Sequence, residues 1–487
     1  MHHGAPGRLP QAPFATIGDA DGLSHSATEF QRLQTPRTVP LDTNLEPGDD
    51  TRGGDEIQWA SEDGDSMLSR LQRQVARSNS GVTSFRPPKG RILPTAMLLA
   101  LSFFTVGSGP EGGESVVVAA GPLVGLVALV VFPVVYFVPM GFMVAELVSA
   151  IPEAGGHAYW VALAFGPAWG LQSGFWAWVG NCGGVEGHAS AGVHAASWNE
   201  YAAGDAELLP PAGRQLRRRD ASRVCPVTLS ALVWIFNGFQ NLSVFAKCVH
   251  DPSRTFRRVM LISLGLIPLS YLVPILPVIA LSDTDWATWT GWGSAAYIAA
   301  KHLGGSMYTL WITVVALICE AGLYIGGLLC SVYLACGMAE KNFAPFSLRF
   351  SGMARPNVYG IDHSVLFCSL AIILIVVTTT IKEMIMISNA LSGLETMVLV
   401  AAAVRLRVTM PDLPRATYLC GSHLLAMTSA LVVPFIASGF VVAWAFTELI
   451  PAALTGVFLF SGIIYGLQTD LKDFRYTYEP VRTIEIA

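Results

Sequence analysis

The chain has 487 residues, of which 52% are hydrophobic and only 13% are charged, and its formal net charge is −5. Together with a mean hydropathy of +0.49, this composition excludes an ordinary soluble globular protein. The sequence is therefore expected to be that of a polytopic membrane protein.

Residues 1–91 form a polar segment, rich in Gly, Pro, Asp and Ser, without an apolar run long enough to be buried. This composition predicts a disordered tail. The first residues contain no apolar core of a signal peptide. We therefore expect a cytoplasmic N-terminal tail, with the first membrane helix acting as its own insertion signal.

Ten stretches are long and apolar enough to cross a bilayer as helices, which takes about 20 residues each. They lie near residues 92–120 (interrupted), 122–150, 158–182, 227–246, 257–281, 306–337, 364–381, 384–404, 418–438 and 443–467. The predicted fold is all-α, with membrane helices over 92–182 and 227–470 and a cytoplasmic C-terminal tail at 471–487. The intervening segment 183–226 mixes charge, Pro and small residues, and we expect an irregular polar loop there.

Basic residues gather in alternate loops, as the positive-inside rule requires of cytoplasmic loops. With both termini inside, the inner loops are 247–258, 338–360 and 405–416, and each holds at least three Lys or Arg. The exception is 183–226, where five arginines fall on the expected outer side. The helices that flank this segment keep their direction only if it contains an even number of spans, so zero and two both fit.

The first predicted span is interrupted by "GSGPEGGE" at residues 107–114. At membrane depth, non-helical backbone is tolerated where it lines a cavity enclosed by protein or filled with water. Glycines permit such backbone and close ligand approach, and the carboxylates Glu111 and Glu114 are expected to face a cavity rather than lipid. The alternative is an interfacial turn between two helices with hydrated glutamates.

A second span, at residues 227–246, has Asn237, Gly238, Gln240 and Asn241 clustered at its middle. Two broken helices at corresponding places in two halves of a membrane chain indicate the central site of a secondary transporter. This pair of breaks therefore favours a cavity over an interfacial turn.

Several motifs together resemble the amino acid/polyamine/organocation transporters, and among them the polyamine uptake carriers of plants and kinetoplastid protozoa. The resemblance covers about residues 92–470 apart from the segment 183–226, called the odd segment below. It rests on "FFTVGSGPEGGESVVVAAGPL", "AELVSAIPEAGGHAYWVALAFGPAWGLQSGFWAWVGN", "GFQNLSVFAKCVHDPSRTF", "CGMAEKNFAPF" and "SGLETMVLVAAAVRLRVTMPDLPRA".

The resemblance implies a fold of two inverted five-helix repeats plus two C-terminal helices, with discontinuous helices one and six around a midplane site. It also implies proton-coupled uptake at the plasma membrane. The implied substrate-binding residues are Gly107, Ser108, Gly109, Glu111, Glu114, Asn237, Phe239, Gln240 and Asn241, and those for proton coupling or gating are Glu146, Glu320 and Glu395. Two alternatives stay open: Glu146 pairs with a nearby cation at the membrane edge, and Glu395 is a buried structural carboxylate.

The sequence departs from the family pattern in three places. Gln240 stands where polyamine carriers typically have an aspartate, and Cys248, beside Lys247, stands where they usually have a glutamate. These changes weaken binding of a dication most, because an amide offers a hydrogen bond but no charge. In addition, the segment 183–226 occupies the place of helices four and five, and its composition fits a frame-shifted or deleted remnant.

The sequence thus predicts proton-coupled uptake of polyamines (putrescine or spermidine) or cationic amino acids, with impaired activity. The alternative is a transporter-like protein that does not transport, either a sensor or an inactive remnant. No enzyme motif is present: there is no HExxH, no GxSxG and no acidic pair in metal-ligand spacing. We expect no metal, no cofactor and no nucleic-acid partner, with the proton gradient as driving force. His157, His188 and His194 are isolated in the sequence, and a loop or interface role is expected for each.

Overall fold

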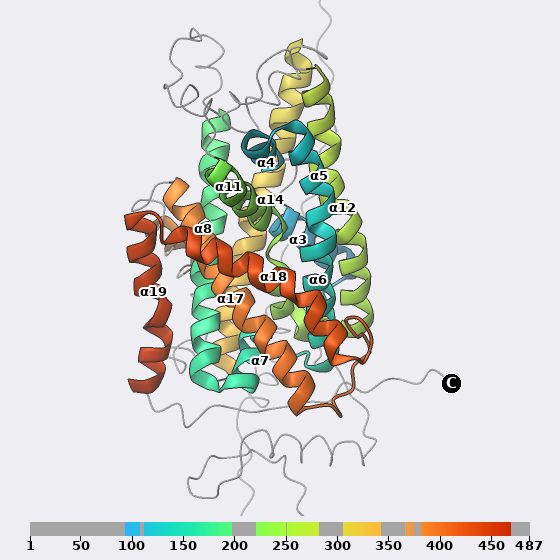
Figure 1. Cartoon of the computed structure of the whole chain (residues 1–487), viewed down its shortest axis with the longest axis vertical. Coiled ribbons are helices and arrows are strands. Elements are labelled where there is room, and N and C mark those ends of the chain that lie inside the picture. The colour runs from blue at the N-terminus through green and yellow to red at the C-terminus, as the bar shows by residue number, and fades with distance from the viewer. Residues whose placement is uncertain are drawn as a thin grey trace, which may run out of the picture. The chain divides into compact units, whose positions relative to one another are not determined.

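The computed structural model describes residues 93–107, 112–196, 221–249, 251–281, 305–341, 381–468 and parts of 366–374. All of them belong to one compact unit that extends from Glu56 to Ala487. The described residues form helices and connections without a strand, which confirms the all-α prediction (Figure 1). Ser108, Gly109 and Glu111 of the expected site lie outside the described residues, as do both terminal tails.

The first predicted span is indeed divided. Helix α3 (Thr95–Gly107) ends at the first glycine of the motif and α4 (Gly113–Ala120) begins after Gly112, whose φ of 99° lies in the left-handed region that glycine tolerates best. The predicted span at 122–150 follows without a gap. It consists of α5 (Pro122–Phe132), the π-helical turn η1 (Pro133–Phe137) and α6 (Val138–Ala150).

The third predicted span, at 158–182, is divided into α7 (Gly156–Phe165) and α8 (Pro167–Ala196). The cause is a Gly-Pro pair: Gly166 has a φ of 98°, and Pro167 cannot donate the hydrogen bond that would continue α7.

The boundaries of the odd segment also differ from the expected loop at 183–226, because α8 continues to Ala196 and α11 already begins at Ala221. The first part of the segment has no Pro before Pro210 and is rich in Ala, so it can remain helical although it is too polar to span.

The second break separates α11 (Ala221–Phe236) from the 3₁₀ helix η2 (Phe239–Cys248), and Gly238 between them has a φ of 117°. Five further long helices follow it in the described part of the chain. They are α12 (Pro252–Leu281), α14 (Gly305–Glu340), α17 (Ile381–Thr409), α18 (Leu424–Ala445) and α19 (Leu449–Gln468).

The last two helices begin about six residues later than predicted. For α18 the cause is that Cys420 and Gly421 adopt positive φ angles in the connection before it.

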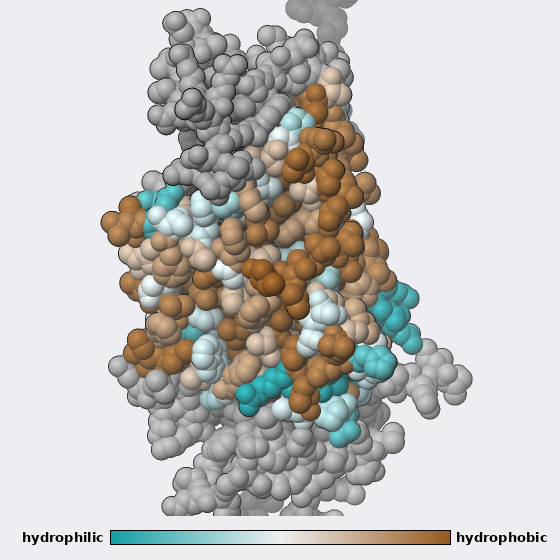
Figure 2. All heavy atoms as spheres, in the orientation of Figure 1, coloured by the Kyte–Doolittle hydropathy of each residue, from teal (hydrophilic) through white to brown (hydrophobic). Residues whose placement is uncertain are grey.

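Helix α8 packs against α7, α14, α17 and α19, and α12 packs against α3 and α6. Large apolar side chains remain exposed along α5 and α12, for example Leu123, Val127, Leu269 and Val273. Figure 2 shows hydrophobic residues gathered over this side of the molecule. In the described part of the chain, six helical segments are long and apolar enough to cross a membrane, so these faces are suited to contact lipid.

Candidate functional site

The end of α3 and the α11–η2 break lie beside a cavity of about 80 Å³. Five elements meet there: α3, α8, the α11–η2 break, α14 and α17. The lining residues are Thr105, Val106, Gly180, Asn181, Trp234, Asn237, Gly238, Asn241, Leu323, Gly327, Cys330, Ser388, Asn389 and Ser392. None of these side chains carries a formal charge at neutral pH, and most of the polar ones are amides or hydroxyls.

Tyr271 of α12 joins the two breaks. Its hydroxyl lies 2.5 Å from the carbonyl oxygen of Gly107 and 3.3 Å from that of Ile235. Both carbonyls lie in the last turn before a break, where a helix leaves its acceptors without partners. A single buried phenol thus satisfies a carbonyl on each side and holds the broken ends of α3 and α11 together.

The amides of Asn181 and Asn241 form the polar centre of the cavity. Asn241 Nδ2 donates to Asn181 Oδ1 over 2.6 Å. The remaining atoms of the two amides, Asn181 Nδ2 and Asn241 Oδ1, are buried without a hydrogen-bond partner among the described residues. Buried polar groups are normally satisfied, so this pair offers one donor and one acceptor to a polar ligand.

Two further amides hold the lining elements in place. The side chain of Asn237 accepts from the backbone N–H of Gly238 over 2.9 Å and from Gln240 Nε2 over 3.3 Å. Asn389 Nδ2 of α17 donates to the hydroxyl of Ser230 on α11 over 3.1 Å. The non-helical residues after α11 are therefore fixed by side chains rather than by the helix ladder.

Glu114 lies outside this lining set. It is the second residue of α4, is 5% exposed, and its Oε2 accepts from the backbone N–H of Gly112 over 2.8 Å. A carboxylate is favoured at a helix N-terminus because the free N–H groups point toward it. In the described structure, this glutamate stabilises the start of α4 and so supports the first break.

Phe239 and Glu320 also lie outside the lining set. Phe239 is buried against Phe137, with ring centroids 4.1 Å apart, and belongs to the apolar core. Glu320 is a largely buried residue of α14, about one turn before the lining residue Leu323.

Glu395 lies next to the cavity, three residues after the lining residue Ser392 on α17. It is 1% exposed, and its two oxygens face two side chains: Oε1 is 3.3 Å from His157 Nε2, and Oε2 accepts from Gln240 Nε2 over 3.5 Å. Gln240 is the neighbour of Asn241, so the carboxyl group lies directly behind the lining of the second break.

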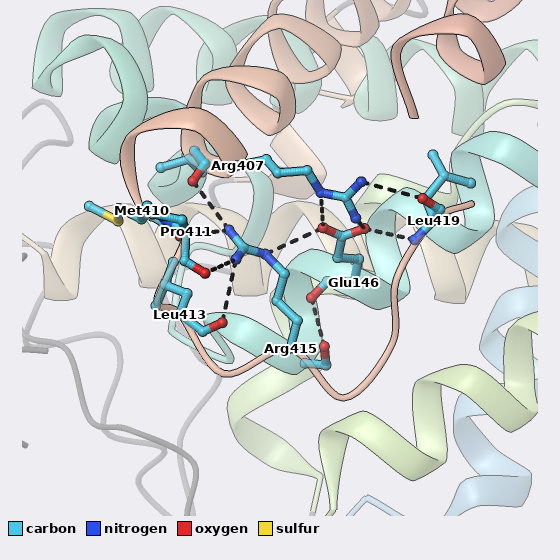
Figure 3. Close-up of polar contacts among 9 residues, drawn as sticks. Glu146, Arg407, Met410, Pro411, Leu413, Arg415 and Leu419 are labelled. Atoms are coloured by element: carbon cyan, nitrogen blue, oxygen red, sulfur yellow. Dashed lines mark hydrogen bonds and ion pairs between the residues drawn. The ribbon is translucent and has the colours of Figure 1, made fainter. Parts of the chain in front are cut away.

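Glu146, near the C-terminal end of α6, is held by two arginines (Figure 3). Arg407 donates to both oxygens, over 3.0 and 2.6 Å, and Arg415 Nε approaches Oε1 to 3.3 Å. The backbone N–H of Leu419 donates to Oε2 over 2.8 Å. A bidentate, charge-assisted arrangement of this kind fixes geometry strongly, so the contacts of Glu146 match the alternative of a structural ion pair.

Of the expected site residues, the structure thus places Asn237 and Asn241 at the cavity and Gln240 and Glu395 behind it. Sequence reasoning missed Asn181, Asn389 and His157. Asn181 closes the motif "GFWAWVGN", and a lone amide at the end of an apolar span was the available signal. The sequence contains no comparable signal for His157, because its partner Glu395 is 238 positions away.

Comparison with known proteins identifies the family of the chain. The model of a family described as amino acid permease matches residues 221–467. Polyamine transporter PUT1 of Oryza sativa subsp. japonica is 27% identical over 376 residues, covering 68% of this chain and 70% of that protein. Polyamine transporter RMV1 of Arabidopsis thaliana is 26% identical over 303 residues, covering 52% of this chain and 61% of that protein.

The match to the family model extends over half of the chain and includes the second helix break and the acid of α17. The chain therefore belongs to the amino acid permease family of the amino acid/polyamine/organocation superfamily, and it is a multi-pass membrane transporter.

Proposed function

We propose that this transporter carries a small cationic substrate, either a polyamine such as putrescine or spermidine or a cationic amino acid, in symport with protons. The observation that supports it most is the cavity between the end of α3 and the α11–η2 break, with the unpaired amide atoms of Asn181 and Asn241. The names of the plant relatives point to a polyamine. The resemblance to the family supports the plasma membrane as its location.

The charges around the cavity favour one substrate class over the other. Neutral amides offer hydrogen bonds but cannot offset the desolvation of two ammonium groups. A cationic amino acid brings its own carboxylate, and the donor Asn181 Nδ2 suits that group. Among the described lining residues no carboxylate is present. We therefore expect arginine or lysine to be carried better than putrescine or spermidine.

Uptake of labelled arginine, lysine, putrescine and spermidine into transport-deficient cells tests the proposal. Each substrate is measured with and without an inward proton gradient, and Asn241→Leu serves as the cavity variant. We expect gradient-dependent uptake of at least one substrate, and its loss in Asn241→Leu. Uptake that does not depend on the gradient would contradict symport, and uptake that Asn241→Leu leaves intact would contradict the cavity as the site.

A relative that does not transport is the second candidate. It is favoured by the residues that replace the family's acids, Gln240 and Cys248, and by the absence of a span-length apolar stretch between residues 183 and 226. Surface expression equal to that of an active carrier, combined with no uptake of any of the four substrates, would support this role instead.

A further inference from the structure

His157 is a buried ionisable residue to which the proposed function gives no role. It is the second residue of α7, fully buried, and its ring lies between η2 and α17. Nδ1 is 3.1 Å from the carbonyl oxygen of Gln240. A carbonyl oxygen can only accept, so Nδ1 carries a hydrogen and donates it.

The hydroxyl of Ser243 supports this tautomer. It accepts from the backbone N–H of His157 over 2.9 Å and donates to the same Gln240 carbonyl over 2.5 Å. The hydroxyl hydrogen is thus engaged with that carbonyl and is not directed at the ring. Two hydrogen bonds from α7 therefore reach η2, the element that begins two residues before the lining residue Asn241.

With Nδ1 protonated, a neutral imidazole presents a lone pair at Nε2. That lone pair is 3.3 Å from Oε1 of Glu395, and neither atom has a hydrogen-bond partner elsewhere in the described part of the chain. An ionised carboxylate would place a second lone pair opposite the first in a buried site, which is strongly unfavourable. One proton between Nε2 and Oε1 replaces the repulsion of the two lone pairs by a hydrogen bond.

The proton can lie on either atom. A protonated Glu395 donates its O–H to Nε2, or an imidazolium donates its Nε2–H to the carboxylate. Both forms have the same composition and a net charge of zero, which suits a buried pair. Loss of the proton to water leaves a net charge of −1 and two facing lone pairs. The neutral and the deprotonated states therefore favour different separations of α7 and α17.

We propose that His157 and Glu395 hold the coupling proton of the carrier as a single shared proton, and that His157 links this proton to the cavity through η2. The proposal rests on the proposed proton symport and adds its partner residue. When the proton leaves, the contact between α7 and α17 loosens. The movement reaches Asn241 through the hydrogen bonds of His157 and Ser243 to the Gln240 carbonyl.

The groups around the pair do not supply another charge. Gln240 and Ser243 face it from η2 and are neutral. Tyr136 of η1 also interacts with Glu395, and a phenol stays neutral across the range from about pH 5 to pH 9. In the part of the chain that the structure describes, the pair is thus the group whose charge state changes at this position.

A first experiment needs no transport. Thermal unfolding of the purified full chain is followed from about pH 5 to pH 9 for the wild type, Glu395→Gln, His157→Asn and the exposed control Asp412→Asn. The amide of Glu395→Gln donates to Nε2 and cannot lose its hydrogen. Its unfolding midpoint relative to wild type should therefore rise with pH, by a few degrees as an order of magnitude. Asp412→Asn should follow the wild type.

A difference between Glu395→Gln and wild type that stays constant with pH would overturn the shared proton. His157→Asn keeps a donor for the Gln240 carbonyl but has no counterpart of Nε2. It should lose stability relative to wild type at every pH, because the Glu395 carboxyl group loses its partner. If this variant does not fold, the comparison of Glu395→Gln with the wild type across the pH range still tests the shared proton.

A second experiment measures coupling. Proteoliposomes containing a pH-sensitive dye report the protons that enter with labelled arginine or putrescine. Glu395→Gln should lose proton movement per substrate molecule carried, whereas damage to the fold lowers both fluxes together and leaves their ratio unchanged. An unchanged ratio in Glu395→Gln would overturn the coupling role. If the wild type carries neither substrate, the proposed function fails. The unfolding midpoints measured across the pH range then test the shared proton by themselves.

Discussion

Glu146 shows how a buried carboxylate can be paired with cations inside a membrane protein. Its side chain is 3% exposed, and two guanidinium groups and a backbone N–H surround its oxygens. Arg415 in turn donates to the backbone carbonyl of Leu406 in the last turn of α17. It also donates to that of Met410, directly after the helix (Figure 3). This ion-pair cluster joins the end of α6 to the end of α17 and folds the connection over it.

We expect Glu146→Gln to destabilise the protein rather than to change coupling. Removing one partner of a buried ion pair leaves an uncompensated charge and typically costs about 3–5 kcal/mol, here on Arg407 and Arg415. Thermal unfolding and the yield of folded protein measure the effect. Arg407→Lys is the matched variant: it keeps the charge but loses the bidentate contact, so its loss should be smaller. A stable Glu146→Gln variant with altered proton movement would contradict a structural role.

The amide pair in the cavity allows a change of substrate preference to be designed. Asn241→Asp places a carboxylate at the cavity, and Asn181 can turn its amide to donate to it, because its Nδ2 has no other partner among the described residues. A hydrogen bond between this carboxylate and an ammonium group of the substrate contributes about 1.5–3 kcal/mol. The ratio of kcat/KM for putrescine to that for arginine should therefore rise about tenfold or more. Asn241→Leu, of similar size but without a polar side-chain atom, should lose uptake of both substrates instead.

At the scale of single residues, the sequence predicted the polar break residues but not their partners. Asn237 and Asn241 could be identified because polar residues in mid-span are rare. The contacts of Glu146 with Arg407 and of Glu395 with His157 join helices far apart in sequence. Only the packed fold brings them together, and no spacing rule could have given them.

At the scale of elements, the glycine motifs predicted two helix breaks, but a third break at a glycine was missed. The breaks after α3 and α11 followed from "GSGPEGG" and "FNGFQN", and both are present in the structure. The division between α7 and α8 was missed, although Gly166-Pro167 was a readable signal, because the apolar run continues across it.

One glycine contact sets how closely the α6–α7 connection approaches α14. A Cβ at Gly337 would lie within 2.1 Å of the backbone nitrogen of Gly155, a contact that neither backbone can relieve. Gly337→Ala should cost about 1–3 kcal/mol or more of stability through overpacking. Gly265→Ala on α12 is the control, since a Cβ there meets nothing within 4 Å. Equal unfolding midpoints for the two variants would show that the connection is not packed this tightly.

At the scale of the whole described unit, several helix ends gather at one end of the helix bundle. The N–H of Leu93, before α3, donates to the carbonyl of Cys248 at the end of η2. Lys341, after α14, pairs with Glu153 in the α6–α7 connection over 2.9 Å. The Glu146 cluster adds the ends of α6 and α17. The basic loops 247–258, 338–360 and 405–416 start from these same helix ends, so the positive-inside rule favours the cytoplasm for this side.

The comparison with relatives also bears on the segment 183–226. The stretch of 376 residues aligned with PUT1 is longer than the 68% of this 487-residue chain that it covers. The alignment therefore has gaps in this chain, with a total length comparable to two membrane helices of about 20 residues each. If these gaps fell within the segment 183–226, two spans would be missing there, and the direction of all later helices would be unchanged.

Two exposed cysteines test that direction. Cys420 lies in the connection between α17 and α18, and Cys225 lies at the start of the candidate span Cys225–Cys248, whose other end lies at the proposed cytoplasmic side. In intact cells, a membrane-impermeant maleimide should label wild type and Cys420→Ser but not Cys225→Ser. After permeabilisation, Cys225→Ser should become labelled through Cys420. Labelling of Cys225→Ser in intact cells would mean that the basic end of the bundle faces outward. An odd number of spans between α8 and α11 would then be required, or the whole orientation would be reversed.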